Sequence, residues 1–211
     1  MKDFDRKAHW ESVYELKDPT EVSWFQAEPV TSLEMITNCG LKLSDPVIDV
    51  GGGASVLVDR MIDQDYTDLT VLDISEAALA SSRNRLGLKA DRVSWVVSDI
   101  TTFSADKTFA LWHDRAVFHF LTEDEDRRCY IQVLKNALEI GGHLIIASFA
   151  IGGPEKCSGL PIVQYDAEKL EKELGAEFKR VSKRSEEHLT PARILQKFNY
   201  FHFVRVNEDE S

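Results

Sequence analysis

The stretch "PVIDVGGGAS", residues 46–55, places three glycines directly after a short β-branched run. The run Val47–Val50 is apolar apart from Asp49, which is typical of a strand buried on both faces of a sheet. The glycines remove every Cβ at the carboxyl end of this strand, so a ligand can approach the backbone closely there. We therefore expect a ligand site where the strand ends.

Short buried runs alternate with longer amphipathic stretches through most of the chain. The expected strands are residues 47–50, 69–72, 93–97, 109–112 and 143–149, and the expected helices between them are 56–64, 76–86 and 124–138. Strands joined by helices require right-handed crossovers. The pattern thus predicts an α/β protein with a mostly parallel sheet covered on both sides.

Two segments lie outside this alternation. At the N-terminus, residues 4–16 and 29–38 are expected to form helices, and the second opens with Pro29 and is followed by Gly40. Near the C-terminus, residues 178–183 and 194–206 are strand-like and separated by only about ten residues, too few for a crossover helix, so they should pair as an antiparallel hairpin. We expect one domain of seven strands, with an N-terminal helical cap (1–40), a core (41–206) and an acidic tail (207–211).

Composition narrows the class of protein. The chain has 211 residues, 43% of them hydrophobic, and no apolar run approaches the roughly 20 residues that span a bilayer. Cys39, Cys129 and Cys157 form no CxxC pair, so neither a disulfide framework nor a metal site is expected. The net charge of −11 argues against nucleic-acid binding. A cytoplasmic protein that binds neither membranes nor nucleic acid is the expectation.

The glycine loop does not suit a phosphate chain. Val56 stands where the dinucleotide pattern G-x-G-x-x-G has its last glycine, and no Lys followed by Ser or Thr completes a phosphate loop. Asp49, two residues before the turn, would repel phosphate and attract an ammonium group. We therefore expect a cofactor that carries positive charge.

Two more acidic residues end the second and third expected strands. Asp73 in "TVLDISEAAL" is placed to accept hydrogen bonds from ribose hydroxyls, and Asp99 in "VVSDITTF" to accept one from an adenine amino group beside the apolar Ile100. Each aspartate is also a plausible turn or helix-cap residue. Their occurrence at successive strand ends favours the ligand site.

Together these motifs, the turn "LEIGGHLIIASF" and the C-terminal hairpin resemble the class I S-adenosylmethionine-dependent methyltransferases over nearly the whole chain. The segments "HWESVYELKDPTEVSWFQ", "WHDRAVFHFL", "GPEKCSGLP" and "HLTPARILQKFNYFHF" resemble a bacterial-type family of small methyltransferases distantly similar to thiopurine S-methyltransferase. The resemblance implies a Rossmann-like doubly wound sheet, S-adenosyl-L-methionine as cofactor and S-adenosyl-L-homocysteine as product. Ile140 replaces the proline usual before the Gly-Gly turn, which affects helix termination.

The resemblance also implies a set of cofactor-binding residues. They follow the cofactor from its methionine part through the ribose to the adenine, and two aromatic residues of the cap close over it. They are Asp49, Gly51, Gly53, Asp73, Ile74, Asp99, Ile100, Tyr14 and Trp24.

We expect the substrate pocket to align the methyl acceptor with the methyl group and to exclude water. An in-line methyl transfer creates no strong new charge that the protein would have to stabilise. A thiol acceptor, with a pKa of about 8.5, needs little help, whereas an ammonium or alcohol needs a base. His113 and His188 are the candidate bases, and His119 is expected to be structural. Arg115 and Cys157 are expected to line the substrate pocket, the latter in the Gly- and Pro-rich loop 151–161.

The expected function is therefore methyl transfer to a small-molecule nucleophile, a thiol or related soft heteroatom. A protein-lysine methyltransferase is the alternative, with the acidic residues 123–126 as a docking rim. A cofactor-binding module without turnover and an NAD-dependent oxidoreductase are further alternatives. The methyl acceptor and the oligomeric state are not specified by the sequence.

Overall fold

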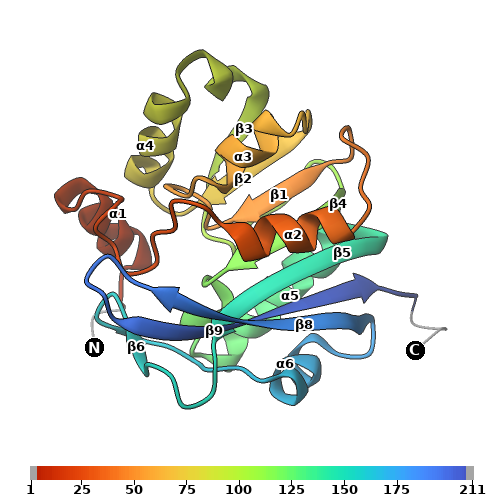
Figure 1. Cartoon of the computed structure of the whole chain (residues 1–211). Coiled ribbons are helices and arrows are strands. Elements are labelled where there is room, and N and C mark those ends of the chain that lie inside the picture. Colours follow the sequence, from red (N-terminus) through yellow and green to blue (C-terminus); the bar gives the residue numbers. More distant parts are fainter. Residues whose placement is uncertain (1–3, 208–211) are drawn as a thin grey trace.

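The computed structural model describes residues 4–207 and shows a seven-stranded sheet with helices on both faces (Figure 1). Most of the expected acidic tail, residues 208–211, lies outside the described residues. The sheet strands are β1 (Val47–Val50), β2 (Leu69–Asp73), β3 (Val93–Val97), β4 (Phe109–Arg115), β5 (Leu138–Phe149), β8 (Phe178–Leu189) and β9 (Leu195–Arg205). The helices are α1 (Arg6–Leu16), α2 (Val30–Asn38), α3 (Leu57–Asp63), α4 (Glu76–Leu86), α5 (Asp124–Ala137) and α6 (Ala167–Leu174).

The strand order is β3-β2-β1-β4-β5-β9-β8, and the first five strands pair in parallel. β9 runs antiparallel to both β5 and β8. The expected Rossmann-like doubly wound sheet with an antiparallel C-terminal pair is thus confirmed. Strand order reverses between β1 and β4, and a crevice forms beyond the carboxyl ends of strands at such a reversal.

Two apolar cores lie on the two faces of the sheet, because neighbouring residues of a strand point to opposite faces. On one face, Trp112 and Ile146 pack with residues of α5 and α6. On the other face, Leu111 and Ile145 pack with α2 and α3. Both faces of the central strands are therefore buried, as the continuous apolar runs predicted.

The C-terminal hairpin differs from the sequence-based expectation. β8 continues to Leu189 and β9 begins at Leu195, so residues 190–194 form a five-residue connection instead of about ten. The expectation placed His188 in the hairpin loop, and this was wrong: His188 lies in β8, paired with Gln196. β8 continues past Lys183 through several charged residues because it is an edge strand. Charged side chains on an edge strand remain in water and discourage the exposed edge from pairing with a second sheet.

Three smaller features were not expected. β5 begins at Leu138, directly after α5, and not at His143 as expected. The backbone is extended through the Gly-Gly turn, and Leu138 pairs with Phe109 of β4. Helix α6, capped by Asp166, follows the loop after β5. Within that loop, β6 (Lys156–Cys157) and β7 (Leu160–Pro161) form a short separate hairpin. No helix within residues 4–207 combines the length and the apolar character needed to cross a bilayer.

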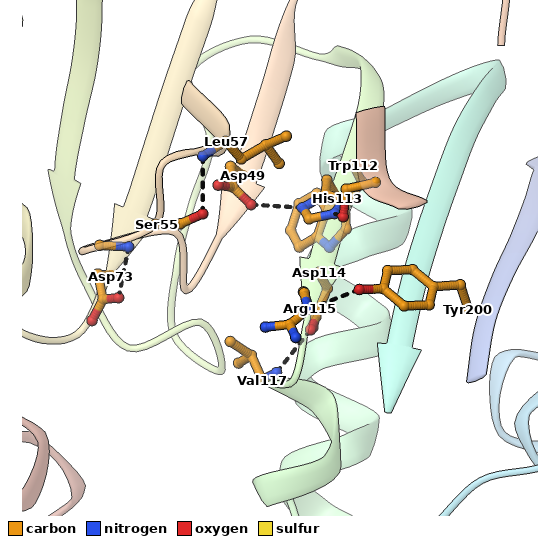
Figure 2. Close-up of polar contacts among 12 residues, drawn as sticks. Asp49, Ser55, Leu57, Asp73, Trp112, His113, Asp114, Arg115, Val117 and Tyr200 are labelled. Atoms are coloured by element: carbon orange, nitrogen blue, oxygen red, sulfur yellow. Dashed lines mark hydrogen bonds and ion pairs between the residues drawn. The ribbon is translucent and has the colours of Figure 1, made fainter. Parts of the chain in front are cut away.

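A buried polar network joins β4 to α5. The Trp112 indole donates to the Tyr130 hydroxyl at 2.9 Å, and that hydroxyl donates to Asp114 Oδ2 at 2.7 Å. Asp114 also accepts from the backbone N–H groups of Val117 and Phe118 (Figure 2). The network holds the backbone turn that follows β4, which borders the functional cavity described below.

We predict that Tyr130→Phe destabilises the protein by about 1–3 kcal/mol, because it leaves the buried Trp112 indole N–H without a partner and removes one donor from the buried Asp114 carboxylate. Burial raises the pKa of Asp114 to about 6, so its ionised form opposes folding above that pH, and the Tyr130 hydroxyl offsets part of this cost. The loss should therefore be larger at pH 8 than at pH 5 in urea unfolding. Tyr66→Phe, in the other core, is the control; an equal loss at both pH values would contradict this account.

Candidate functional site

A cavity lies beyond the carboxyl ends of β1, β2, β3 and β4, at the reversal of strand order. The cavity has a volume of about 110 Å³ and opens to solvent. We call it the main cavity. A side pocket continues from it past Gly51, and the two share Tyr14, Trp24, Val50 and Arg115 as well.

Gly51 forms the bend between the two spaces. Its φ is +69°, a left-handed conformation that side chains rarely adopt, and its N–H donates to Leu72 O at 2.7 Å. A Cβ at this position would lie 2.0 Å from Val117 Cγ2. At Gly53 a Cβ would lie 2.5 Å from Asp73 Oδ2. Only glycine permits the loops after β1, β2 and β4 to approach one another this closely.

Asp73 and Asp99 both line the main cavity. Asp73 accepts from Gly53 N at 3.0 Å and from Ser75 N at 2.9 Å, and burial raises its pKa to about 6. Ser75, not Asp73, caps α4. Asp99 Oδ1 accepts from the backbone and hydroxyl of Thr101, which leaves its other oxygen 3.7 Å from the Arg6 guanidinium. Ile74 and Ile100, the residues that follow the two aspartates, also line this cavity.

Asp49 lies in the side pocket rather than in the main cavity. Its Oδ1 accepts from His113 Nδ1 at 2.7 Å, and His113 Nε2 contacts the Ser32 hydroxyl at 2.9 Å (Figure 2). Asp49 Oδ2 is buried without a hydrogen-bond partner. This site therefore offers an unsatisfied carboxylate oxygen, and the structure places His113 behind it, on the side away from the main cavity.

Aromatic residues of the N-terminal segment cover the main cavity. The Trp10 ring packs edge-on against Trp24 and Phe120, with centroids 5.7 and 4.9 Å away. The Trp24 indole donates to the Tyr14 hydroxyl at 3.2 Å. Burial raises the pKa of Tyr14 well above its usual range, so its hydroxyl stays neutral.

Arg115 ties this cap to the sheet. Its Nη1 donates to Trp24 O at 2.9 Å and its Nε donates to the Tyr200 hydroxyl at 2.8 Å. The guanidinium lies 4.7 Å from the centre of the Phe198 ring (Figure 2 shows Arg115 and Tyr200). Its Nη2 is buried with no hydrogen-bond partner and lies 4.0 Å from Glu186 Oε1, at a wall shared by both spaces.

The other residues expected in the substrate pocket do not all lie there. Cys157 lines the main cavity, and burial raises the pKa of its thiol to about 11, so it is a neutral wall residue near pH 7. His188 lines neither space: its Nε2 donates to Ser23 O at 2.8 Å and thereby anchors the segment that carries Trp24. His119 is buried, stacks on Phe149 at 5.2 Å, and burial lowers its pKa to about 3. Gly53 supports Asp73 and lines neither space.

Several lining residues were not anticipated from the sequence. Arg6 reaches the main cavity from α1 and pairs with Asp126 of α5 and Asp99. Ala116 and Val117 form the wall opposite Gly51, and Ala116 has a φ of +73°, unusual for a residue with a Cβ. Such a strained residue next to a cavity is a known mark of functional sites, but nothing in the sequence signals it.

Comparison with known proteins supports a methyl-transfer site. Residues 41–203 match the family model described as a methyltransferase domain. The chain is 26% identical over 162 residues to the eEF1A lysine and N-terminal methyltransferase of Mus musculus, covering 75% of this chain and 22% of that protein. It is 31% identical over 101 residues to nodulation protein S of Rhizobium tropici, covering 48% of this chain and 42% of that protein. The matched part thus spans less than half of either relative.

A solved structure shows the same fold. The N-methyltransferase NodS from Bradyrhizobium japonicum WM9, in complex with S-adenosyl-L-homocysteine, superposes with a TM-score of 0.70 at 19% identity, covering 96% of this chain and all of that chain. This chain belongs to the class I S-adenosylmethionine-dependent methyltransferases. Its cofactor is S-adenosylmethionine, so family membership argues against the NAD-dependent oxidoreductase that the sequence left as an alternative.

The residues present fit this cofactor. The unpartnered Asp49 Oδ2 suits the ammonium of the methionine part, and the carboxylates of Asp73 and Asp99 at the next two strand ends suit hydroxyl and amino donors. The bend at Gly51 carries no Cβ that would fill the junction between main cavity and side pocket. A phosphate chain would instead meet carboxylates on this side.

We predict that Gly51→Ala weakens cofactor binding at least about tenfold, because the new methyl group displaces Val117 into the main cavity. Gly87→Ala is the matched control: Gly87 also has a positive φ of +56°, but a Cβ there meets no atom within 4 Å. Both variants should lose about 1–2 kcal/mol of stability from the left-handed backbone. Titration with S-adenosyl-L-homocysteine and urea unfolding separate the two effects; equal affinities in both variants would contradict a role for close packing at Gly51.

Proposed function

We propose that this enzyme methylates a small-molecule acceptor, a thiol or a related soft heteroatom that needs no strong base. The observation that carries the proposal is the buried Arg115 Nη2, which pairs with Glu186 Oε1 at 4.0 Å but donates no hydrogen bond, in an otherwise largely aromatic and aliphatic wall. A fixed cation with a free donor attracts an acceptor that carries negative charge, such as a thiolate.

On the cofactor side, the proposal assigns each expected residue a part. Asp49, positioned by His113, would bind the ammonium group of the methionine part. Gly51 would let that part of the cofactor lie close to the backbone. Asp73 and its neighbour Ile74 would bind the ribose. Asp99 and Ile100 would bind the adenine, Gly53 would support Asp73, and Tyr14 and Trp24 would cover the cofactor.

When bound, S-adenosylmethionine supplies an electrophilic methyl group on a sulfonium centre. The chain's own contribution is alignment and water exclusion. Trp10, Tyr14 and Trp24 close the main cavity, while Arg115 and His188 fix the backbone of the cap segment through Trp24 O and Ser23 O. Holding the acceptor at attack distance in a site without water substantially lowers the free-energy barrier to such a displacement.

The absence of a histidine from the described lining of the main cavity supports a readily ionised acceptor. Among residues 4–207, no histidine lines the main cavity. A thiol with a pKa of about 8.5 is partly ionised at neutral pH, so it reacts without proton removal by the protein. The resemblance to thiopurine S-methyltransferase expected from the sequence points to the same acceptor class. The free Cys39, Cys129 and Cys157 suit the reducing, cytoplasmic setting that we propose.

A protein amine is the second candidate acceptor. A surface groove at the mouth of the main cavity is lined by Asp5, Glu123 and Asp126 together with Phe4 and Phe120. Carboxylates beside aromatic rings attract a lysine side chain or an N-terminal amine. One relative is named as a lysine and N-terminal methyltransferase. Arg115 argues against this candidate, because it would repel an ammonium group at the reacting end.

We predict that cofactor affinity depends on the ionisation of Asp73. Burial raises the pKa of Asp73 to about 6, so lowering the pH through 6 protonates the carboxyl and removes acceptor sites for hydroxyl groups. Affinity for S-adenosyl-L-homocysteine should be constant above pH 7 and fall by up to about tenfold per pH unit below 6.

Asp73→Asn should weaken binding by about 1–3 kcal/mol at pH 7.5 and remove this pH dependence. Calorimetric titration between pH 5 and 8 measures both. Asp114, whose pKa is also raised to about 6, is unchanged in the variant and controls for its contribution. An Asp73→Asn profile parallel to that of the wild type would remove Asp73 from the site.

We predict that thiol pools accept labelled methyl groups faster than small amines or lysine-containing peptides. Arg115→Gln should lower kcat/KM for anionic thiols at least about tenfold, because it removes the cation. His188→Gln is the matched control: it loosens the same cap segment but leaves the guanidinium in place. Incorporation of label only into protein would favour the second candidate, and binding of S-adenosyl-L-homocysteine without any transfer would contradict both.

A further inference from the structure

A second cluster of reactive side chains lies away from both the main cavity and the side pocket. Cys39 follows the last turn of α2, His143 lies in β5 and His202 in β9. His143 stands four residues before Ala147, the residue paired with Arg115, which is about 13 Å along the strand. The cluster is therefore separate from the methyl-transfer site. Figure 1 shows α2, which leads into Cys39, lying beside β5.

The three side chains offer their donor atoms to one point. One donor atom from each lies within 4.8 Å of the others. His143 Nδ1 and His202 Nε2 are 2.8 Å apart, and Cys39 Sγ is 3.6 Å from the same His202 nitrogen. In a tetrahedral zinc site, Zn–N of about 2.0–2.1 Å and Zn–S of about 2.3 Å place donor atoms about 3.3–3.6 Å apart. Small rotations about the side-chain bonds bring this cluster to that geometry.

The protonation state of the cluster also suits a metal ion. A contact between two ring nitrogens needs one donor and one acceptor, so at least one of the two imidazoles is neutral. The Cys39 thiol donates to Met35 O at 3.3 Å, a weak bond that a metal ion readily replaces. His202 is buried, whereas Cys39 and His143 remain partly exposed, which leaves an approach for an ion and for a water molecule as fourth ligand.

We propose that Cys39, His143 and His202 bind one divalent transition-metal ion of the zinc class. One thiolate and two imidazoles are the soft and borderline donors that zinc prefers over magnesium or calcium. On binding, the thiol proton of Cys39 leaves to solvent and the sulfur-metal bond forms. The ring nitrogen that donated in the His143–His202 contact also gives up its proton, through solvent, to the other nitrogen of the same ring. Both facing ring nitrogens then donate a lone pair to the ion. Among residues 4–207, this is the one group of three such side chains whose donor atoms converge.

The ion would tie the end of α2 to β5 and β9. Helix α2 also carries Ser32, whose hydroxyl contacts His113 behind Asp49. The metal therefore fixes the helix that supports the methionine side of the cofactor site without touching the reacting atoms. The sequence-based expectation of no metal relied on CxxC spacing, whereas these ligands come from three distant elements.

The test is a titration of the chelator-treated chain with Co²⁺, followed by absorption, and then displacement by Zn²⁺. We expect one Co²⁺ per chain, with the visible bands of a tetrahedral ion and a near-ultraviolet sulfur-to-metal band. Cys39→Ala should lose the sulfur band and bind at least about 100-fold more weakly, and His143→Gln should bind at least about tenfold more weakly. Cys129→Ala, a free cysteine of α5, should match the wild type.

A measurement on the wild-type chain covers the case in which a variant does not fold. Saturating Zn²⁺ should slow alkylation of Cys39 by iodoacetamide at least about tenfold, while Cys129 reacts at an unchanged rate, as read from the modified peptides by mass spectrometry. An unchanged Cys39 rate, the absence of saturable Co²⁺ absorption, or a sulfur band that survives in Cys39→Ala overturns the proposal.

Discussion

The close approach of backbone segments at Gly51 is the constraint on which the site depends. β1 turns there in a left-handed conformation, and the missing Cβ lets Val117 of the β4 turn approach from one side. Gly53 does the same for Asp73 of β2. Three strand ends thereby meet around one cavity at the reversal of strand order, where the fold leaves a crevice between its helices.

The charges of the site are divided between its two sides. Carboxylates lie at or just after the ends of β1, β2 and β3, whereas Arg115 ends β4 and presents a nitrogen that donates no hydrogen bond. In the proposed function, the first side would hold the ammonium group and the hydroxyl donors of the cofactor, and the second would favour an electron-rich acceptor. Such a division of charge would orient the two reactants relative to each other.

The cap is held by hydrogen bonds to the C-terminal half of the chain as well as by its own packing. Ser23 O, Trp24 O and Gln26 are bonded to His188, Arg115 and Glu186, respectively. Two of these three partners lie in β8, the edge strand, more than 150 positions away in sequence. The antiparallel pair therefore serves the site as well as the sheet, because the segment that covers the main cavity is anchored on it.

Local sequence determined the parallel sheet, the glycine bend and the three strand-end aspartates, because strand periodicity, missing Cβ atoms and strand-end acids are properties of a few adjacent residues. Only the tertiary structure decided that His113 lies behind Asp49, that His188 anchors the cap from β8, and that Cys39, His143 and His202 converge. These contacts join residues 59 to 165 positions apart. Their geometry follows from strand register and helix placement, which no local pattern encodes.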